Sequence, residues 1–284
     1  KEPKIKKDLK KDSHIKFLLT IIFSVIGFIS LYSIINNPYE KSDIILSFLF
    51  SSGRLIGCFI FSFFIIYLLI LIKFISKEKV SKSYFSPIAN FLTRYGKFAF
   101  FILLLISLYR IADIVMGVMA NIFYLEKGYK ISEIATFSKF FGVFATIVGG
   151  FIGGYCSYKF GTMKALFFGA LIAALSNLLF AWLAVSPISI DFLIAVITAD
   201  NISSGFAGAA FVIYLSGLTS IKFTATQYAL FSSIMLFLPK LIAGYAGAWV
   251  DIMGYAYFFT LTAFLGLPVL LLIIWIGRVA PIKK

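Results

Sequence analysis

One long apolar run, residues 97–121, reads KFAFFILLLISLYRIADIVMGVMAN, with Arg110 and Asp113 in its middle and Asn121 at its end. A charged side chain at bilayer depth costs about 2.5–3.5 kcal/mol on insertion scales. At about 100° per residue, Arg110, Asp113, Gly117 and Asn121 fall on one stripe of a helix. The run therefore predicts a membrane-spanning helix whose polar face lies in a bundle interior or a watery cavity.

The composition of the whole chain agrees with this prediction. Of its 284 residues, 61% are hydrophobic and only 13% are charged, which excludes a soluble globular protein. The apolar runs approach or exceed the roughly 20 residues that cross a bilayer. We therefore predict an all-α integral membrane protein with about eight transmembrane helices, at 15–35, 46–72, 98–120, 133–156, 164–184, 191–217, 225–249 and 255–277.

The basic residues predict the orientation of these helices. The net charge of +14 comes mainly from segments between the apolar runs, so nucleic-acid binding is not indicated. Alternate loops hold most of the Lys and Arg residues, whereas the others hold only Lys41, Lys127 and Lys130. Because basic loops stay on the cytoplasmic side, both termini are expected there, in a multi-pass protein.

Several chemistries lack the residues that they require. Cys58 and Cys156 lie in or at the ends of apolar runs without a pairing pattern, and the single histidine, His14, precedes the first span. Neither a disulfide framework nor a zinc site is indicated. We expect no catalytic residues, no metal and no cofactor. The chain begins with Lys1 rather than Met, so we expect that a segment upstream of it has been removed.

The spacing of the apolar runs predicts two membrane regions. The only sizeable gap is rich in Lys and Ser, so the main boundary is placed there. The expected order is a basic cytoplasmic tail (1–14), a transmembrane helix pair (15–72), a basic cytoplasmic linker (73–97), a set of six helices (98–277) and a cytoplasmic tail (278–284).

Further polar residues lie within the predicted spans and complete a candidate binding or proton-coupling set. The set is Arg110, Asp113, Asn121, Lys139, Asn177, Asp200, Asn201, Gln227 and Lys240. Three cations and two carboxylates suit an anionic solute that moves together with protons, and Asp113 or Asp200 could carry the proton. Purely structural roles stay open, because Arg110 and Asp113 could simply neutralise each other, and Asp200 and Asn201 could join helices.

Two glycine pairs indicate an internal repeat. Gly154 and Gly161 stand seven residues apart between two spans, and Gly247 and Gly254 do the same 93 residues later. Because three spans separate the pairs, the repeat would have inverted topology, as in many secondary transporters. Together with Lys159 and Asp251, these glycines form a candidate conformational loop motif. The small residues of 149–154 and 243–248 are also consistent with static close packing of helices.

Four stretches of the chain resemble the AmpG-type muropeptide permeases of the major facilitator superfamily. They are LYRIADIVMG (108–117), GGFIGGYCSYKFG (149–161), ADNISSGFAGAAF (199–211) and FTATQYAL (223–230). The second stretch is similar to a loop motif of the superfamily, although Tyr158 stands at its usual Asp position and Lys159 at its Arg position. The resemblance implies that 15–72 is the extra central helix pair and that 98–277 is the C-terminal six-helix half.

The resemblance also implies a function. The expected activity is proton symport of anhydro-muropeptides, which are sugar-peptide fragments, across the bacterial inner membrane during peptidoglycan recycling. The expected partners are the lipid bilayer, protons, the substrate and a missing N-terminal six-helix half, supplied by the same longer chain or by a separate subunit. Two alternatives stay open: a carrier of another bulky anionic solute such as an acyl-CoA, or a non-transporting remnant or interaction subunit. A membrane enzyme is disfavoured by the short loops.

Overall fold

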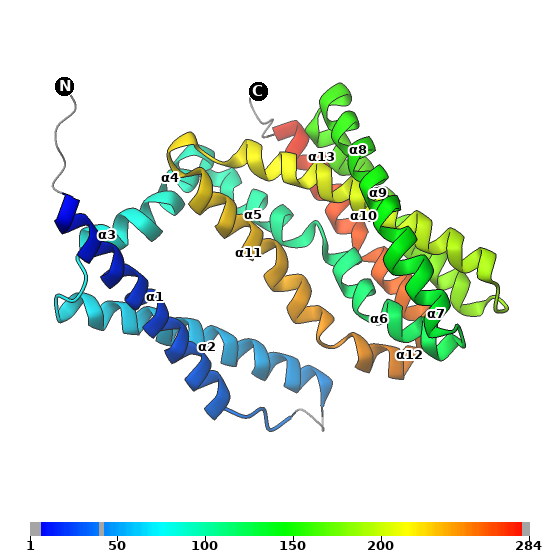
Figure 1. The fold of residues 1–284 in the computed structure, drawn as a ribbon, viewed down its shortest axis with the longest axis horizontal. Helices are drawn as coiled ribbons and strands as arrows, with labels where there is room; N and C mark the ends of the chain where they lie inside the picture. Colours follow the sequence, from blue (N-terminus) through cyan, green and yellow to red (C-terminus); the bar gives the residue numbers. More distant parts are fainter. Residues whose placement is uncertain (1–6, 40–42, 280–284) are drawn as a thin grey trace. The chain divides into compact units, whose positions relative to one another are not determined.

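Figure 1 shows the computed structural model of the chain, which describes residues 7–39 and 43–279. The described residues form helices and connecting turns, without a β-strand among them. Eight helical segments in this part are long and apolar enough to cross a membrane. The predicted all-α integral membrane protein is therefore confirmed. The outermost parts of both predicted tails, 1–6 and 280–284, lie outside the described residues.

The chain divides into two compact units, residues 1–89 and 90–284. The first unit contains α1 (Lys7–Ile34), α2 (Ile44–Leu71), α3 (Lys77–Val80), the π-helical turn η1 (Ser81–Phe85) and the start of α4 (Ser86–Tyr95). The hairpin of α1 and α2 is joined by polar contacts, since Ser62 Oγ donates to the Ser24 carbonyl at 2.9 Å. Arg54 donates to the Ile35 carbonyl and the Tyr32 hydroxyl, at 2.7 and 2.6 Å.

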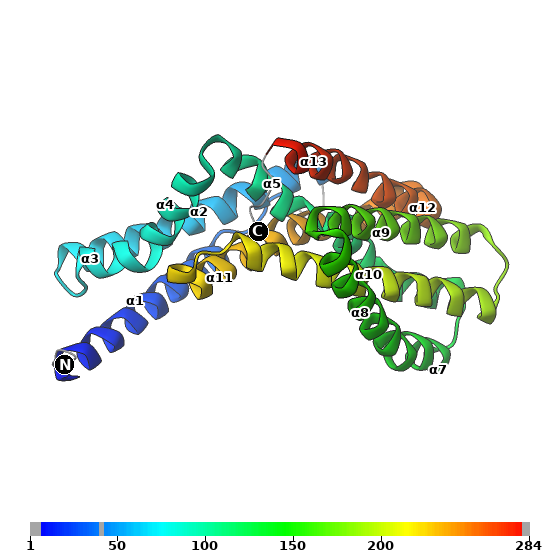
Figure 2. The same ribbon diagram turned by 90° about the horizontal axis from the view of Figure 1, so that it is seen from above.

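The second unit holds the remaining helices. They are η2 (Gly96–Phe98), α5 (Ala99–Leu108), α6 (Ile111–Lys127), α7 (Ile131–Ile134), the π-helical η3 (Ala135–Phe141), α8 (Gly142–Phe160), α9 (Thr162–Val185), α10 (Ile190–Leu218), η4 (Ile221–Phe223), α11 (Thr224–Ala243), α12 (Ala246–Phe264) and α13 (Gly266–Val279). Helices α8, α9 and α10 lie side by side, α11 packs on α5 and α6, and α12 packs on α6 and α9 (Figures 1 and 2).

Glycines allow α8 and α10 to approach closely. A Cβ atom added at Gly149 would lie 2.2 Å from the Ile202 carbonyl oxygen, and one at Gly205 would lie 2.1 Å from that of Thr146. Gly153 faces the Phe206 backbone in the same way. Close packing thus accounts for these three small residues. It does not account for Gly154 or Gly247, because an added Cβ would meet nothing within 4 Å at either position.

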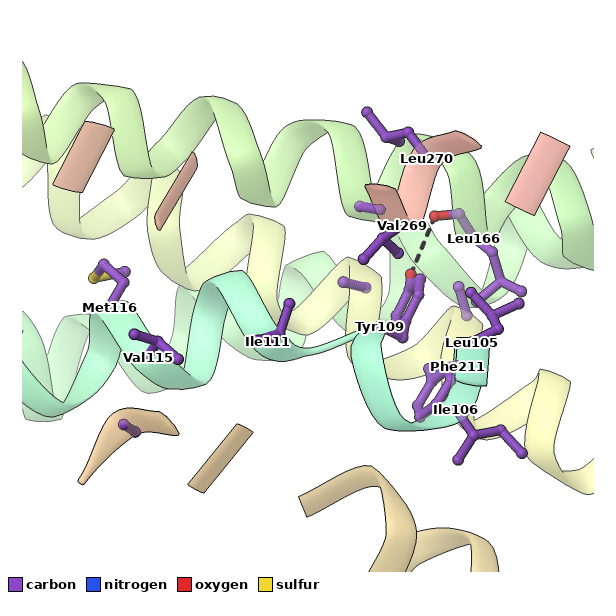
Figure 3. Packing of buried hydrophobic residues seen from close by; sticks show 14 of the residues in the cluster. Leu105, Ile106, Tyr109, Ile111, Val115, Met116, Leu166, Phe211, Val269 and Leu270 are labelled. Carbon is purple, nitrogen blue, oxygen red and sulfur yellow. Dashed lines mark hydrogen bonds between the residues drawn. The ribbon is translucent and has the colours of Figure 1, made fainter. Parts of the chain in front are cut away.

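The predicted helix 98–120 is interrupted in its middle. The helix α5 ends at Leu108 and α6 begins at Ile111, and Arg110 takes non-helical angles of φ −99° and ψ 11°. Tyr109 anchors the break, because its ring stacks on Phe211 at 4.5 Å and its hydroxyl donates to the Leu166 carbonyl at 3.2 Å (Figure 3). The prediction of one continuous helix was wrong at these two residues.

The last two predicted spans also differ in their limits. Helix α11 continues through Pro239 and ends at Ala243, and α12 begins at Ala246, so the span predicted at 225–249 is divided at Gly244 and Tyr245. Helix α12 is interrupted at Gly254, whose φ of 76° and ψ of 165° are close to the 90° and 150° of Gly161 between α8 and α9. The two candidate loop glycines thus share a left-handed backbone conformation that favours glycine.

The segment predicted as a linker, 73–97, is largely helical. Within the second unit, Phe91 of α4 is buried with its ring 5.0 Å from that of Phe231. Arg94 donates to the carbonyl of Leu218 and, at 3.3 Å, to that of Thr219, where α10 ends. These contacts satisfy carbonyl groups that the end of a helix leaves free. The predicted functional identity of each region stays a prediction.

Candidate functional site

The break between α5 and α6 sets the position of the main candidate pair. The Arg110 guanidinium forms an ion pair with the Asp113 carboxylate one turn further along the chain. It also donates to Ser204 Oγ on α10 at 3.1 Å. Both members of the pair are partly buried, with side-chain exposures of 24% and 17%. The ion pair that the sequence left open as a purely structural role therefore forms, and Arg110 links the start of α6 to α10.

A second carboxyl group, Asp200 on α10, lies beside this pair. Asp200 interacts electrostatically with both Asp113 and Arg110. Ser176 Oγ on α9 lies 3.5 Å from Asp200 Oδ1 but only 2.8 Å from the Ala173 carbonyl. A hydroxyl group has one proton to donate, so Ser176 donates it to the nearer acceptor, the Ala173 carbonyl. Asp200 thus has no short hydrogen-bond donor and no ion-pair partner among the described residues.

Three serines complete what we call the polar network, which comprises Arg110, Asp113, Ser176, Asp200, Ser203 and Ser204. Ser203 Oγ lies 3.2 Å from Ser176 Oγ and donates to the Asp200 carbonyl at 2.8 Å. The serines were not predicted as site residues. Two of them, Ser203 and Ser204, stand three and four residues after Asp200, which is one helical turn, so this spacing could have pointed to them.

The polar face predicted for 97–121 is exposed along α6, beyond the ion pair. Gly117 and Asn121 are exposed and follow Asp113 at intervals of four residues. The buried residues of α6, among them Val115 and Met116, pack into the hydrophobic core instead (Figure 3). Asn121 therefore lies on the same side of the helix as the ion pair, in a position that a solute or another polypeptide could reach.

Two of the predicted asparagines join helices. Asn177 of α9 is 1% exposed and donates to the Ala112 carbonyl and to Thr262 Oγ1, both at 3.2 Å. Asn201 accepts from Thr146 Oγ1 at 3.0 Å and donates to the Ile197 carbonyl at 2.8 Å. Although Asn201 follows Asp200 in sequence, its side chain contacts α8 and not the polar network.

Gln227 lies in the first turn of α11 (Thr224–Ala243). Its side chain is fully buried, and its Oε1 accepts from the Ser220 backbone N–H at 2.7 Å. Its Nε2 donates to Asn90 Oδ1 at 3.3 Å. The structure therefore gives Gln227 contacts that hold a loop to α4, at the end of α10 where Arg94 also binds.

The two remaining cations of the predicted set stand apart from the ion pair. Lys139 in the π-helical η3 and Lys240 in α11 are both exposed, and neither forms an ion pair within the described ranges. The loop residues Lys159 and Asp251 are exposed as well. The described residues contain no group of three or more His, Cys, Asp or Glu side chains that could hold a metal ion.

The fold and the polar network define the class: a multi-pass, all-α membrane protein with charged groups inside a helix bundle. No protein-family model matches the chain. It is 36% identical over 193 residues to Putative transporter AmpG 4 of Rickettsia felis, covering 68% of this chain and 46% of that protein. The protein of the same name from Rickettsia conorii is also 36% identical, over 192 residues, with 68% and 46% covered.

A differently numbered protein, Putative transporter AmpG 1 of Rickettsia bellii, is 35% identical over 192 residues, covering 67% of this chain and 47% of that protein. These similarities confirm the resemblance to AmpG-type transporters. The matched region spans about half the length of these curated relatives.

Proposed function

We propose that this chain forms the central helix pair and the C-terminal half of a proton-coupled secondary transporter that imports anhydro-muropeptides. The transporter would lie in the bacterial inner membrane with both termini of this chain in the cytoplasm. Its N-terminal six-helix half would come from the same longer protein or from a separate subunit. The AmpG names of the relatives favour this transport role over that of a membrane enzyme.

The polar network is the observation that carries this proposal. An ion pair, a further carboxyl group and three hydroxyl groups lie together between α6, α9 and α10. Such groups are costly within a membrane and usually mark a solute or proton pathway. The exposed Gly117 and Asn121 continue the network along α6, so the pathway would open toward the side that the facing half covers.

The two carboxyl groups suit proton coupling in different ways. Asp113 is bound to Arg110, whereas Asp200 has no cationic partner among the described residues. Binding a proton would remove the repulsion between an ionised Asp200 and Asp113. Releasing that proton would give Arg110 a second carboxylate to attract. We therefore place the exchangeable proton on Asp200 and assign Asp113 to holding Arg110.

Uptake of labelled anhydro-muropeptide tests the proposal in cells that lack their own permease. This chain is expressed alone and together with the upstream half. Two variants of this chain, Asp113→Asn and Asp200→Asn, are also expressed together with the upstream half. Without substitutions, we expect uptake only when this chain is expressed together with the upstream half. Asp200→Asn should make residual uptake insensitive to the proton gradient, and Asp113→Asn should abolish uptake because Arg110 loses its partner.

Asp191→Asn is the matched control, because Asp191 is an exposed carboxylate in the first turn of the same helix. It should transport like the wild type. Uptake of another bulky anion, such as an acyl-CoA, would replace the proposed substrate. If all proteins reach the membrane and none transports either solute with the upstream half present, the chain is a remnant or an interaction subunit.

A further inference from the structure

A groove that the transport proposal does not use lies between α8, α9, α10 and α13. Its volume is about 1030 Å³, and its walls are almost entirely apolar, with Phe160, Phe167, Phe168 and Ile274 among the lining residues. Phe168 and Ile274 are 52% and 39% exposed. Since they belong to candidate membrane-spanning helices, the groove would offer an acyl chain continuous apolar contact.

One end of this groove carries positive charge. Lys164, three residues into α9, is exposed and lines the groove. Phe160 and Gly277 also line it, and each has a basic neighbour in the chain, Lys159 and Arg278 respectively. The end of α13 lies against the start of α9, because a Cβ atom added at Gly277 would lie 3.6 Å from Met163 Cε.

No acidic residue offsets these cations within the segments that form this end. The end of α8 and start of α9 read SYKFGTMK (157–164), and the end of α13 reads GRV (277–279), without Asp or Glu. Lys159 and Arg278 are both exposed. The groove thus has an apolar body, and basic residues lie at one of its ends.

We infer that this groove binds an anionic phospholipid, with its acyl chain along the apolar walls and its phosphate against Lys164 and the neighbouring Lys159 and Arg278. Basic pockets between membrane helices bind anionic lipid headgroups in this manner. The inference is independent of the transport proposal, because it requires neither a facing half nor a transported solute.

Lipid retention by the purified 284-residue chain tests the inference. The chain is delipidated in detergent and exposed to phosphatidylglycerol or phosphatidylcholine with identical acyl chains, and bound lipid is counted by native mass spectrometry. We expect preferential retention of phosphatidylglycerol that weakens as salt rises. Lys164→Gln and Arg278→Gln should each reduce this preference about fivefold, the factor equal to ~1 kcal/mol per basic residue near an anionic lipid surface.

Two further variants separate the charge from the groove. Gly277→Leu fills the groove without changing the charge, so it should reduce retention of both lipids. Lys222→Gln removes an exposed lysine that does not line the groove, and it should have no effect. Equal retention of both lipids by the wild type, or an equal loss in Lys222→Gln and Lys164→Gln, would overturn the inference. Displacement of bound phosphatidylglycerol by the co-purified upstream half would identify the occupant as protein and overturn it as well.

Discussion

At the scale of single residues, the polar side chains within the membrane divide into two groups. Asn177 and Gln227 are buried and form hydrogen bonds between elements. Asn121, Lys139 and Lys240 are exposed on the second unit. The first group contributes to stability, whereas the second group is available to a solute or a partner. Sequence composition treats both groups alike, because burial depends on how the helices pack.

Replacing Asn177 by Ala should destabilise the second unit. The change removes the hydrogen bonds to the Ala112 carbonyl and to Thr262 Oγ1. An interhelical hydrogen bond in a membrane protein contributes about 0.6 kcal/mol on average, so we expect a loss of about 1 kcal/mol. This loss of stability is measured by unfolding the protein in mixed detergent micelles that contain increasing amounts of a denaturing detergent.

Asn121→Ala is the matched control for this measurement, since Asn121 is an exposed asparagine on α6. Its unfolding midpoint should equal that of the wild type, and its effect should appear in transport instead. An equal loss of stability in both variants would contradict the division between buried and exposed asparagines.

At the scale of helices, close approach and interruption matter most. Helix α8 lies against α10 through glycines, and breaks at Arg110 and Gly244 divide two of the predicted spans, whereas the break at Gly254 falls in the predicted connection between the last two. The break at Arg110 lets its side chain reach both Asp113 and Ser204. Helical periodicity predicts the polar stripe of 97–121, but it does not predict the break, where Tyr109 contacts α9 and α10.

Gly205→Ala should weaken the contact between α8 and α10. The new methyl group would lie 2.1 Å from the Thr146 carbonyl oxygen, so the helices must separate. Overpacking of this kind costs about 1–3 kcal/mol. The same detergent-unfolding assay should show an earlier transition.

Gly154→Ala provides the matched control, because its methyl group would meet nothing within 4 Å. Alanine also has a higher helix propensity than glycine. This variant should therefore be as stable as the wild type or slightly more stable. A larger loss in Gly154→Ala than in Gly205→Ala would show that the packing of α8 differs from that described here.

At the scale of the whole molecule, the distribution of Lys and Arg predicts which loops face the cytoplasm. Cysteine labelling tests this orientation after Cys58 and Cys156 are replaced by Ser. In intact cells, a membrane-impermeant thiol reagent should label Lys130→Cys, in the connection between α6 and α7. Lys222→Cys, between α10 and α11, should be labelled only after the membrane is opened.

Both positions are exposed in the structure, so a difference in labelling reports the side of the membrane and not burial. The reverse pattern would place the termini outside. It would also place the basic end of the lipid groove in the outer leaflet, although the lipid-retention experiment in detergent does not depend on this orientation.

The sequence alone determined the fold class, the eight spans and the AmpG resemblance, because apolar run length and local motifs are properties of the linear chain. It also placed Arg110, Asp113 and Asp200 in the membrane as candidates. Only the tertiary structure joined these three with Ser176, Ser203 and Ser204, and only it assigned Asn177 and Gln227 to packing. The physical reason is that hydrogen bonds and burial between helices depend on helix rotation, breaks and close approach, which no single segment specifies.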